Sequence, residues 1–269
     1  MRTFPFVLLA LTSLANDVAA QTAEQPNIML TIFGGAGTGH SVWTMAKQPV
    51  LVIGSNPAQW DTVRLEQSIT PSIILGAGAT YFPSPHVGLH IELSYLGLPV
   101  DASCDSVFFH LDFDRKNAQT CDDIRQRSAD GGSIAIFGGA TFRAASRGAV
   151  SPYARVNLGF VNETRSTIEV SGGYVDATGA NVQELVSDPH PRRTSVLFGA
   201  AAGFTRPLGP GYQFRWEVRD LIVPMDRLLQ PAVPQAGGVI GPTATRLYHH
   251  FSMILGFDVV LEKKRGRRY

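Results

Sequence analysis

Apolar and polar residues alternate along much of this chain, and this period of two limits the fold more than any other feature of the sequence. The clearest example is GYQFRWEVRDLIV, residues 211–223. One face of this segment carries Tyr212, Phe214, Trp216, Val218 and Ile222, and the other carries Gln213, Arg215, Glu217 and Arg219. Successive side chains of a β-strand point to opposite faces, so the alternation predicts a strand with one apolar face and one polar face. Only Asp220 interrupts the apolar face.

Seven further segments show the same alternation, some of them less strictly. They are residues 27–35, 68–82, 86–97, 132–144, 151–162, 194–205 and 246–262. No long segment shows the periodicity of an amphipathic helix. The sequence therefore predicts an all-β protein with eight strands.

The connections between these segments are of two kinds that alternate along the chain. Three are tight and rich in proline and glycine, PSPH, SRGA and PLGPG, and such segments are typical of turns. The other four links are long, and they are Thr38–Leu65, Pro99–Gly131, Glu163–Arg193 and Pro224–Thr245. Long links without secondary structure are unusual in a compact soluble domain, so these need a reason.

An even number of strands, with short turns at one end and long loops at the other, resembles the small outer-membrane β-barrels of the OmpA/OmpX type. The resemblance covers nearly the whole mature chain and implies a closed antiparallel up-and-down transmembrane β-barrel of eight strands. Lipid cannot satisfy an open strand edge, so a spanning sheet must close. It also implies a monomer in the bacterial outer membrane, in contact with lipid, lipopolysaccharide and the barrel-assembly machinery.

The two ends of the chain fit an exported protein. Arg2 precedes the apolar run FPFVLLALTSLA, and small residues end at Ala20, so residues 1–20 are expected to be a cleaved signal peptide. Residues 21–262 then form the barrel with four long outer loops. Gly256, Val259 and Leu261 have the spacing of the family's C-terminal assembly signal, but the basic tail KKRGRRY, residues 263–269, replaces the usual terminal aromatic residue. By resemblance the tail is periplasmic.

Composition narrows the class of partner and suggests one covalent link. The net charge is +1, and no general basic field indicates a nucleic-acid partner. Cys104 and Cys121 are the two cysteines, both in one polar segment of an exported chain, which favours a disulfide. A metal pair is the competing interpretation, but only His110 lies nearby as a further ligand.

If the apolar faces point outward, the polar faces fill the barrel. They then carry an interior charge network of Glu92, Arg143, Arg155, Arg215, Glu217, Arg219 and Asp258. The interior of an eight-stranded barrel is just filled by side chains, and buried charges must be paired. We expect a structural plug, with a gated proton or ion path as the alternative.

Two short motifs suggest a ligand site. The stretch TIFGGAGTGHS has the spacing of a phosphate-binding loop, but His40 replaces the lysine and no helix pattern follows. The glycines are better explained by a bend in a strand or by a crowded interior. Asp112 and Asp114 have calcium-like spacing, but Lys116 occupies the next ligand position. We therefore expect no cofactor and no metal.

One motif suggests an enzyme. His250-Phe251-Ser252, with Glu262 further on, is similar to part of the site of outer-membrane lipid A deacylases. His250 and Ser252 share the face that we expect to be inward, and Met253 replaces the family's asparagine. No catalytic residue is therefore predicted.

The predicted function is non-enzymatic, with a structural, adhesion or surface-recognition role and an unknown loop ligand. The alternative from another class is a soluble periplasmic lipocalin-like barrel, which binds a ligand and has its apolar face inside. Periodicity alone does not decide which face is inside. Long apolar faces with few charges, abundant glycine and alanine, and alternating loop lengths favour the membrane barrel.

Overall fold

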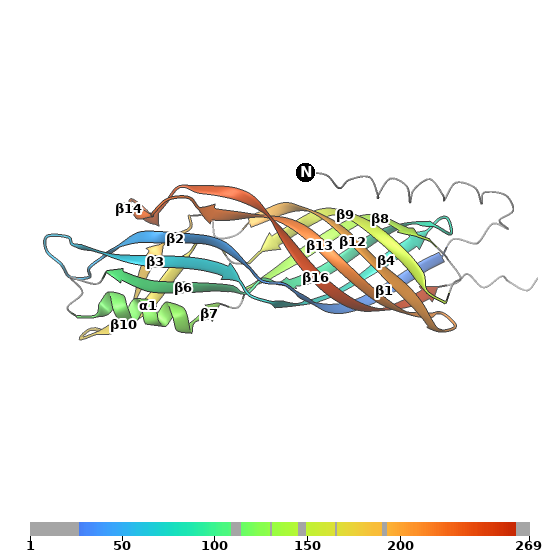
Figure 1. The fold of residues 1–269 in the computed structure, drawn as a ribbon, viewed down its shortest axis with the longest axis horizontal. Helices are drawn as coiled ribbons and strands as arrows, with labels where there is room; N and C mark the ends of the chain where they lie inside the picture. The colour runs from blue at the N-terminus through green and yellow to red at the C-terminus, as the bar shows by residue number, and fades with distance from the viewer. Residues whose placement is uncertain are drawn as a thin grey trace, which may run out of the picture.

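The computed structural model describes residues 27–108, 114–129, 131–144, 149–164, 166–189 and 193–261. The predicted signal peptide, the basic tail and Glu262 lie outside the described residues. Eight antiparallel strands form a closed barrel in the order β1-β16-β13-β12-β9-β8-β5-β4. Figure 1 shows the barrel strands crossing one half of an elongated molecule. These strands are β1 (Asn27–Gly37), β4 (Ser72–Phe82), β5 (Val87–Gly97), β8 (Gly132–Arg143), β9 (Ser151–Glu163), β12 (Arg193–Gly209), β13 (Tyr212–Leu228) and β16 (Thr243–Leu261).

The barrel closes between the first and last of its strands. β1 pairs with β16 from Ile28, opposite Leu261, to Gly37, opposite Ser252. Every predicted strand is present, and the prediction of a closed eight-stranded antiparallel barrel is confirmed. β13 and β16 are longer than the alternation indicated because their outer ends continue beyond the barrel, whereas β12 is longer at its short-turn end, where it runs on to Gly209.

The alternation in sequence becomes an alternation between the outside and the inside of the barrel. In β9, each residue from Ser151 to Glu163 is in turn buried and exposed. Val156, Leu158 and Phe160 lie on the exposed face, whereas Arg155 and Asn157 are buried. Closure of the sheet thus gives this barrel an apolar outer wall and a polar interior.

The four long links are not structureless, which corrects the expectation of plain loops. Most of their residues fold into a body that we call the head, made of the elements that lie between the barrel strands together with the outer ends of β13 and β16. The elements are β2 (His40–Leu51), β3 (Trp60–Ile69), β6 (Val100–Phe108), α1 (Lys116–Gln126), β7 (Ser128–Ala129), β10 (Val170–Asp176), β11 (Gly179–Val186), β14 (Val233–Gln235) and β15 (Gly238–Ile240).

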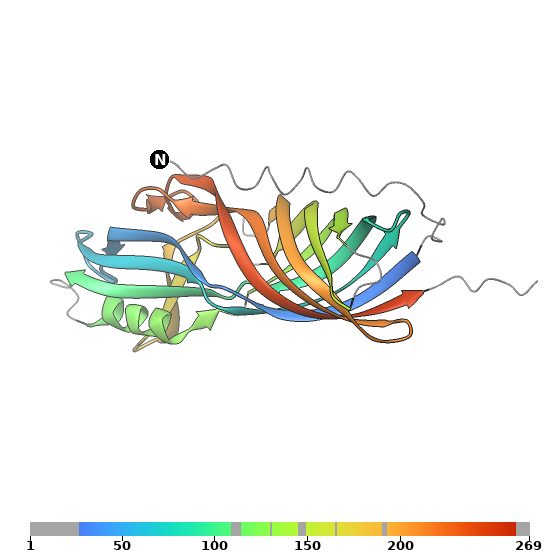
Figure 2. The ribbon, with the colours of Figure 1, turned by 45° about the vertical axis from the view of Figure 1, so that its right-hand side comes forward.

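The main sheet of the head continues one side of the barrel wall. Its order, β2-β3-β6-β7, repeats the order β1-β4-β5-β8 of the barrel strands to which these elements connect. Figures 1 and 2 show the blue, cyan and green strands running from the barrel into this sheet. The breaks fall at Gly39, Pro71 and Pro99. Proline has no backbone N–H and interrupts the hydrogen-bond ladder, so the wall can change direction there.

The helix α1 was not predicted, because half of its buried face is polar. Asn117, Thr120, Cys121 and Ile124 are its buried residues, at the spacing of one helical face. A search for apolar periodicity does not find such a face. Within the described residues, no helix is long and apolar enough to cross a membrane.

The head has a hydrophobic core that belongs to the same cluster as buried apolar side chains of the barrel such as Phe33 and Ile254. Its buried apolar side chains come from all four links, and they include Trp43, Val50, Val63, Leu65, Val100, Cys104, Ile124, Ile168, Val170, Leu185, Val186 and Ala232. Burial of apolar side chains is the main favourable term in folding, so these links form a packed body.

Candidate functional site

Six of the seven predicted network residues meet in the middle of the barrel. Arg219 Nη2 is 2.8 Å from Glu92 Oε2 and 2.7 Å from Glu217 Oε1. Arg155 Nη1 donates to Glu92 Oε1. Arg215 Nη2 donates to Asp258 Oδ1 at 3.0 Å. The three acids and three arginines come from β5, β9, β13 and β16, so the network connects four barrel strands through side chains.

Neutral residues that sequence reasoning did not assign complete the network. The hydroxyl of Tyr153 donates to Glu217 Oε2 at 2.8 Å, and that of Thr31 donates to Asp258 Oδ1 at 2.6 Å. Nearby, His90 Nε2 lies 2.7 Å from Asn157 Oδ1. These residues lie on the same inward faces as the charges, so the alternation marks their positions but not their partners.

Arg143, the seventh predicted residue, lies at the short-turn end of the barrel. Its guanidinium carbon is 3.9 Å from the ring centroid of Phe82, and its Nε donates to the carbonyl oxygen of Pro85. A cavity of about 20 Å³ near this end is lined by Arg143, Arg155, Arg215 and Asp258, among others. That volume holds a water molecule or two. The interior therefore has the geometry of a filled and charge-balanced barrel.

The outer face of the barrel is an apolar band. Side chains such as Ile32, Leu89, Ile91, Ile136, Leu158, Phe198, Met253 and Leu255 are each about half exposed or more. A continuous apolar surface of this size is exceptional on a soluble protein. Outer-membrane barrels carry aromatic residues at the two membrane interfaces, and here Tyr81 and Tyr212 lie on the exposed outer face. Phe82, Trp43 and Tyr248 are buried, and Trp60 belongs to the head.

One pair of polar side chains, Asp220 and His249, interrupts the band at its outer edge. Asp220 Oδ2 lies 2.7 Å from His249 Nδ1, and both side chains are on the outward face. His249 pairs with Ile222 in the register, and the next outward residue of β13 is Pro224, which leads into the head. The pair therefore lies where a bilayer would give way to headgroups, and a charge there costs little.

The glycine-rich stretch and the His250–Ser252 motif both lie in strands that form the barrel wall. β2 begins at His40, directly after the glycine-rich stretch, so a strand follows where a phosphate loop needs a helix. A Cβ on Gly37 would lie 2.4 Å from His250 Nε2, so the glycine makes room for an interior side chain. His250 and Ser252 are both buried, and the Ser252 hydroxyl donates to the backbone oxygen of Arg219 at 3.4 Å. Neither side chain reaches the outer face.

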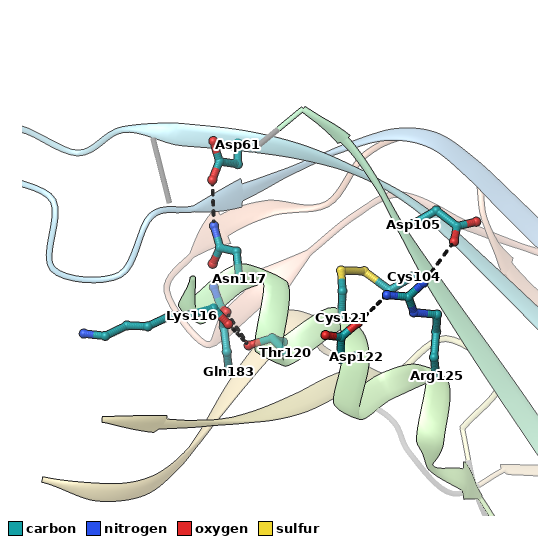
Figure 3. Close-up of a disulfide and its surroundings, with 10 residues drawn as sticks. All are labelled: Asp61, Cys104, Asp105, Lys116, Asn117, Thr120, Cys121, Asp122, Arg125 and Gln183. Atoms are coloured by element: carbon teal, nitrogen blue, oxygen red, sulfur yellow. Dashed lines mark hydrogen bonds and ion pairs between the residues drawn. A yellow bond between two sulfur atoms is a disulfide. The ribbon is translucent and has the colours of Figure 1, made fainter. Parts of the chain in front are cut away.

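Cys104 of β6 and Cys121 of α1 form a disulfide, which Figure 3 shows at the centre of the helix contacts. Both cysteines are buried, although the segment that holds them is polar in sequence. Asn117 Nδ2 donates to Asp61 Oδ2 of β3 at 3.2 Å, and the Thr120 hydroxyl donates to Gln183 Oε1 of β11 at 3.1 Å. The disulfide thus belongs to a set of links that fix α1 in the head.

The described residues contain no cluster of three or more potential metal ligands. Asp114 lies 3.7 Å from Lys116 Nζ, which is also 3.7 Å from Asp176 Oδ2. The Lys116 ammonium group therefore pairs with two carboxylates, one of which is Asp114 of the calcium-like motif. Asp112 and His110 lie outside the described residues.

No protein-family model and no curated protein matches the sequence. The chain is similar in structure to Neisserial surface protein A (NspA), with 10% identity, 88% of this chain and 99% of that chain covered, and a TM-score of 0.44. It is also similar to the outer membrane protein OprG from Pseudomonas aeruginosa, with 11% identity, coverage of 88% and 96%, and a TM-score of 0.49. For the outer membrane protease OmpT from Escherichia coli the identity is 6%, the coverage 91% and 99%, and the TM-score 0.38.

Proposed function

We propose that this chain is a bacterial outer-membrane protein whose barrel anchors the head at the cell surface, where the head serves in adhesion or surface recognition. The observation that carries the proposal is which side chains of the barrel strands point outward and which point inward. Its outer wall is an apolar band, and its interior holds paired charges. This is the arrangement that a lipid environment requires of a spanning sheet.

The direction in which the polar and apolar side chains point argues against the soluble lipocalin-like barrel. Such a barrel needs an apolar interior to bind its ligand and a polar surface to stay in solution. Here Arg215 and Glu217 are almost completely buried, whereas Ile91 and Leu255 are exposed. The exposed apolar band would make a soluble form prone to aggregation.

A non-enzymatic role agrees with the chemistry of the described side chains. A serine nucleophile needs a base within reach and access to its substrate. Ser252 bonds to a backbone oxygen inside the barrel, away from the outer face. We propose a monomer that meets lipid and lipopolysaccharide through the band and an unidentified ligand through the head.

Location and orientation can be tested with epitope insertions. An epitope between Ala177 and Thr178, in the turn of the β10–β11 hairpin, should bind antibody on intact cells. The matched insertion after Pro210, in the short turn between β12 and β13, should bind only after the outer membrane is permeabilised. Equal binding at both positions on intact cells, or recovery of the protein from the soluble periplasmic fraction, would overturn the proposal.

A further inference from the structure

The head contains a cavity near the outer end of β2 and β3. Its volume is about 340 Å³, and three separate hairpins supply its walls. Val50, Leu51 and Trp60 come from the β2–β3 hairpin, Tyr174 and Val182 from β10–β11, and Val239 from β14–β15. Cavities of this size and lining are typical of small-molecule sites.

Specific hydrogen bonds fix the three hairpins relative to one another. The side-chain amide of Gln48 donates to the Ala232 oxygen at 2.7 Å and accepts from the Ala232 nitrogen at 2.9 Å. Gln183 Nε2 donates to the Leu51 oxygen at 3.2 Å. The Ser187 nitrogen donates to the Val239 oxygen at 2.8 Å, and the Val239 nitrogen donates to Ser187 Oγ at 3.0 Å. The walls are thus preformed, which lowers the entropy that a ligand must offset.

The cavity is open, and its apolar lining reaches solvent. Trp60 is 42% exposed and Val182 is 65% exposed. Both side chains would lose apolar surface to water if a ligand filled the cavity, and burial of that surface favours binding.

The charge of the lining selects among ligands. Glu184 is the one carboxylate among the lining residues, and no lysine, arginine or histidine lines the cavity. Glu184 Oε2 accepts a hydrogen bond from Ser187 Oγ at 2.7 Å, so this carboxylate is held at the wall. Aromatic rings attract cations through their π-faces, and Lys116 Nζ already lies 5.9 Å from the ring centroid of Tyr174. A carboxylate and two aromatic rings complement a positive charge.

The edge of β2 argues against an added peptide strand. Pro49 has no N–H, its carbonyl oxygen accepts from Gln48 Nε2 at 3.0 Å, and the Leu51 oxygen accepts from Gln183. Strand addition needs free backbone donors and acceptors on such an edge. The ligand must therefore bind mainly through side-chain contacts.

We propose that this cavity binds a small amphipathic amine, with its apolar body against Leu51, Trp60 and Val182 and its ammonium group at Glu184. The inference rests on the proposed function in one respect, because it takes the head to be outside the cell. It names the chemical class of a ligand that the head recognises there.

The test uses the full protein in lipid nanodiscs and isothermal titration calorimetry, with empty nanodiscs subtracted. The probes are 2-phenylethylamine, the neutral 2-phenylethanol and the anionic 3-phenylpropanoate. The amine should bind at least about tenfold more tightly than the carboxylate. Glu184→Gln should weaken amine binding by about fivefold and leave the alcohol unchanged. No binding of the amine up to about 10 mM, or equal binding of amine and carboxylate, would overturn the proposal.

Substitution of two equally exposed valines locates the binding site, and neither substitution removes a buried side chain. Val182 lines the cavity, whereas Val175 on the same hairpin does not, and their exposures are 65% and 64%. Val182→Ser should weaken binding several-fold, and Val175→Ser should leave it unchanged. Equal effects of the two substitutions would refute this cavity as the site. If the protein does not bind the amine although antibody reaches the epitope in the head on intact cells, this inference alone is contradicted. If the protein binds the amine but antibody does not reach that epitope on intact cells, the proposed function alone is contradicted.

Discussion

Glu92 and Arg219 lie 127 positions apart in the chain, and Arg219 Nη2 donates a hydrogen bond to Glu92 Oε2 at 2.8 Å inside the barrel. The other oxygen of the same carboxylate accepts from Arg155. One side chain of β5 therefore joins β9 and β13 across the interior of the barrel. These three strands are not neighbours in the sheet. Removal of one partner from a buried ion pair leaves an uncompensated charge, and that cost exceeds the net value of the pair.

Glu92→Gln should therefore be strongly destabilising. The substitution leaves Arg155, Arg215 and Arg219 opposite two carboxylates, and we expect a loss of about 3–5 kcal/mol in the free energy of unfolding. Urea titration of the protein refolded in lipid vesicles measures this quantity. The control is Glu66→Gln in the head, because Glu66 pairs with Arg64 at 4.0 Å, and the side chains of Glu66 and Arg64 are 38% and 54% exposed. That change should cost less than about 1 kcal/mol. Equal losses for the two variants would contradict a structural role for the network.

Much of the barrel could be predicted because a period of two is a local property of the sequence. Arg215, Glu217 and Arg219 had to share a face once β13 was a strand. Which partner each one meets could not be predicted, because that depends on the register of strands far apart in the chain. The contacts of Tyr153 with Glu217 and of Thr31 with Asp258 were missed for the same reason.

The disulfide should stabilise the head and not the barrel. Cys104 and Cys121 are 17 positions apart, and closure of a loop of this size contributes about 3 kcal/mol in the chain-entropy model. Cys104→Ser with Cys121→Ser should make the head sensitive to added protease, while the barrel fragment stays protected in lipid. Mass mapping of the fragments distinguishes the two parts. Cleavage within the barrel strands at the same rate as in the head would contradict this division.

The head lay beyond sequence reasoning because its folding depends on contacts between links. The buried face of α1 contains Asn117 and Thr120, whose partners Asp61 and Gln183 come from other links. The cavity has walls from three links, and no spacing within one link indicates it. Only Cys104 and Cys121 gave a local signal that this region is ordered.

Glu163 should make stability fall as pH rises toward neutrality. It ends β9, three residues beyond Phe160, the last outward apolar residue of that strand. Burial raises the pKa of Glu163 to about 7; Arg193 opposes this shift and Asp226 adds to it. Above the unfolded pKa, near 4.5, the native state keeps a proton that the unfolded chain releases, so stability declines between about pH 4.5 and 7.

The variant Glu163→Gln isolates this contribution. The difference in free energy of unfolding between this variant and the wild type should grow in favour of the variant by up to about 3 kcal/mol across that pH window. Above the window the difference should stay constant. Unfolding midpoints in urea at pH 4.5, about 6 and about 8 measure the difference. Glu169→Gln, at an exposed position six residues further along the chain, is the control and should show no such growth. A constant difference for Glu163→Gln across the window would contradict the assignment.

Gly35 and its neighbour Gly34 should respond very differently to alanine. A Cβ on Gly35 would lie 2.2 Å from the backbone oxygen of Met253, whereas a Cβ on Gly34 would first meet the Leu75 side chain at 3.3 Å. Gly35 lies in the seam where β1 closes on β16, and a backbone atom there cannot move without opening the ladder. Gly35→Ala should cost about 1–3 kcal/mol, and Gly34→Ala clearly less, because a side chain can shift. The fraction of each variant that keeps its folded mobility in unheated SDS gels is the measurement. Similar fractions for both would mean that the glycines of this stretch do not serve barrel closure.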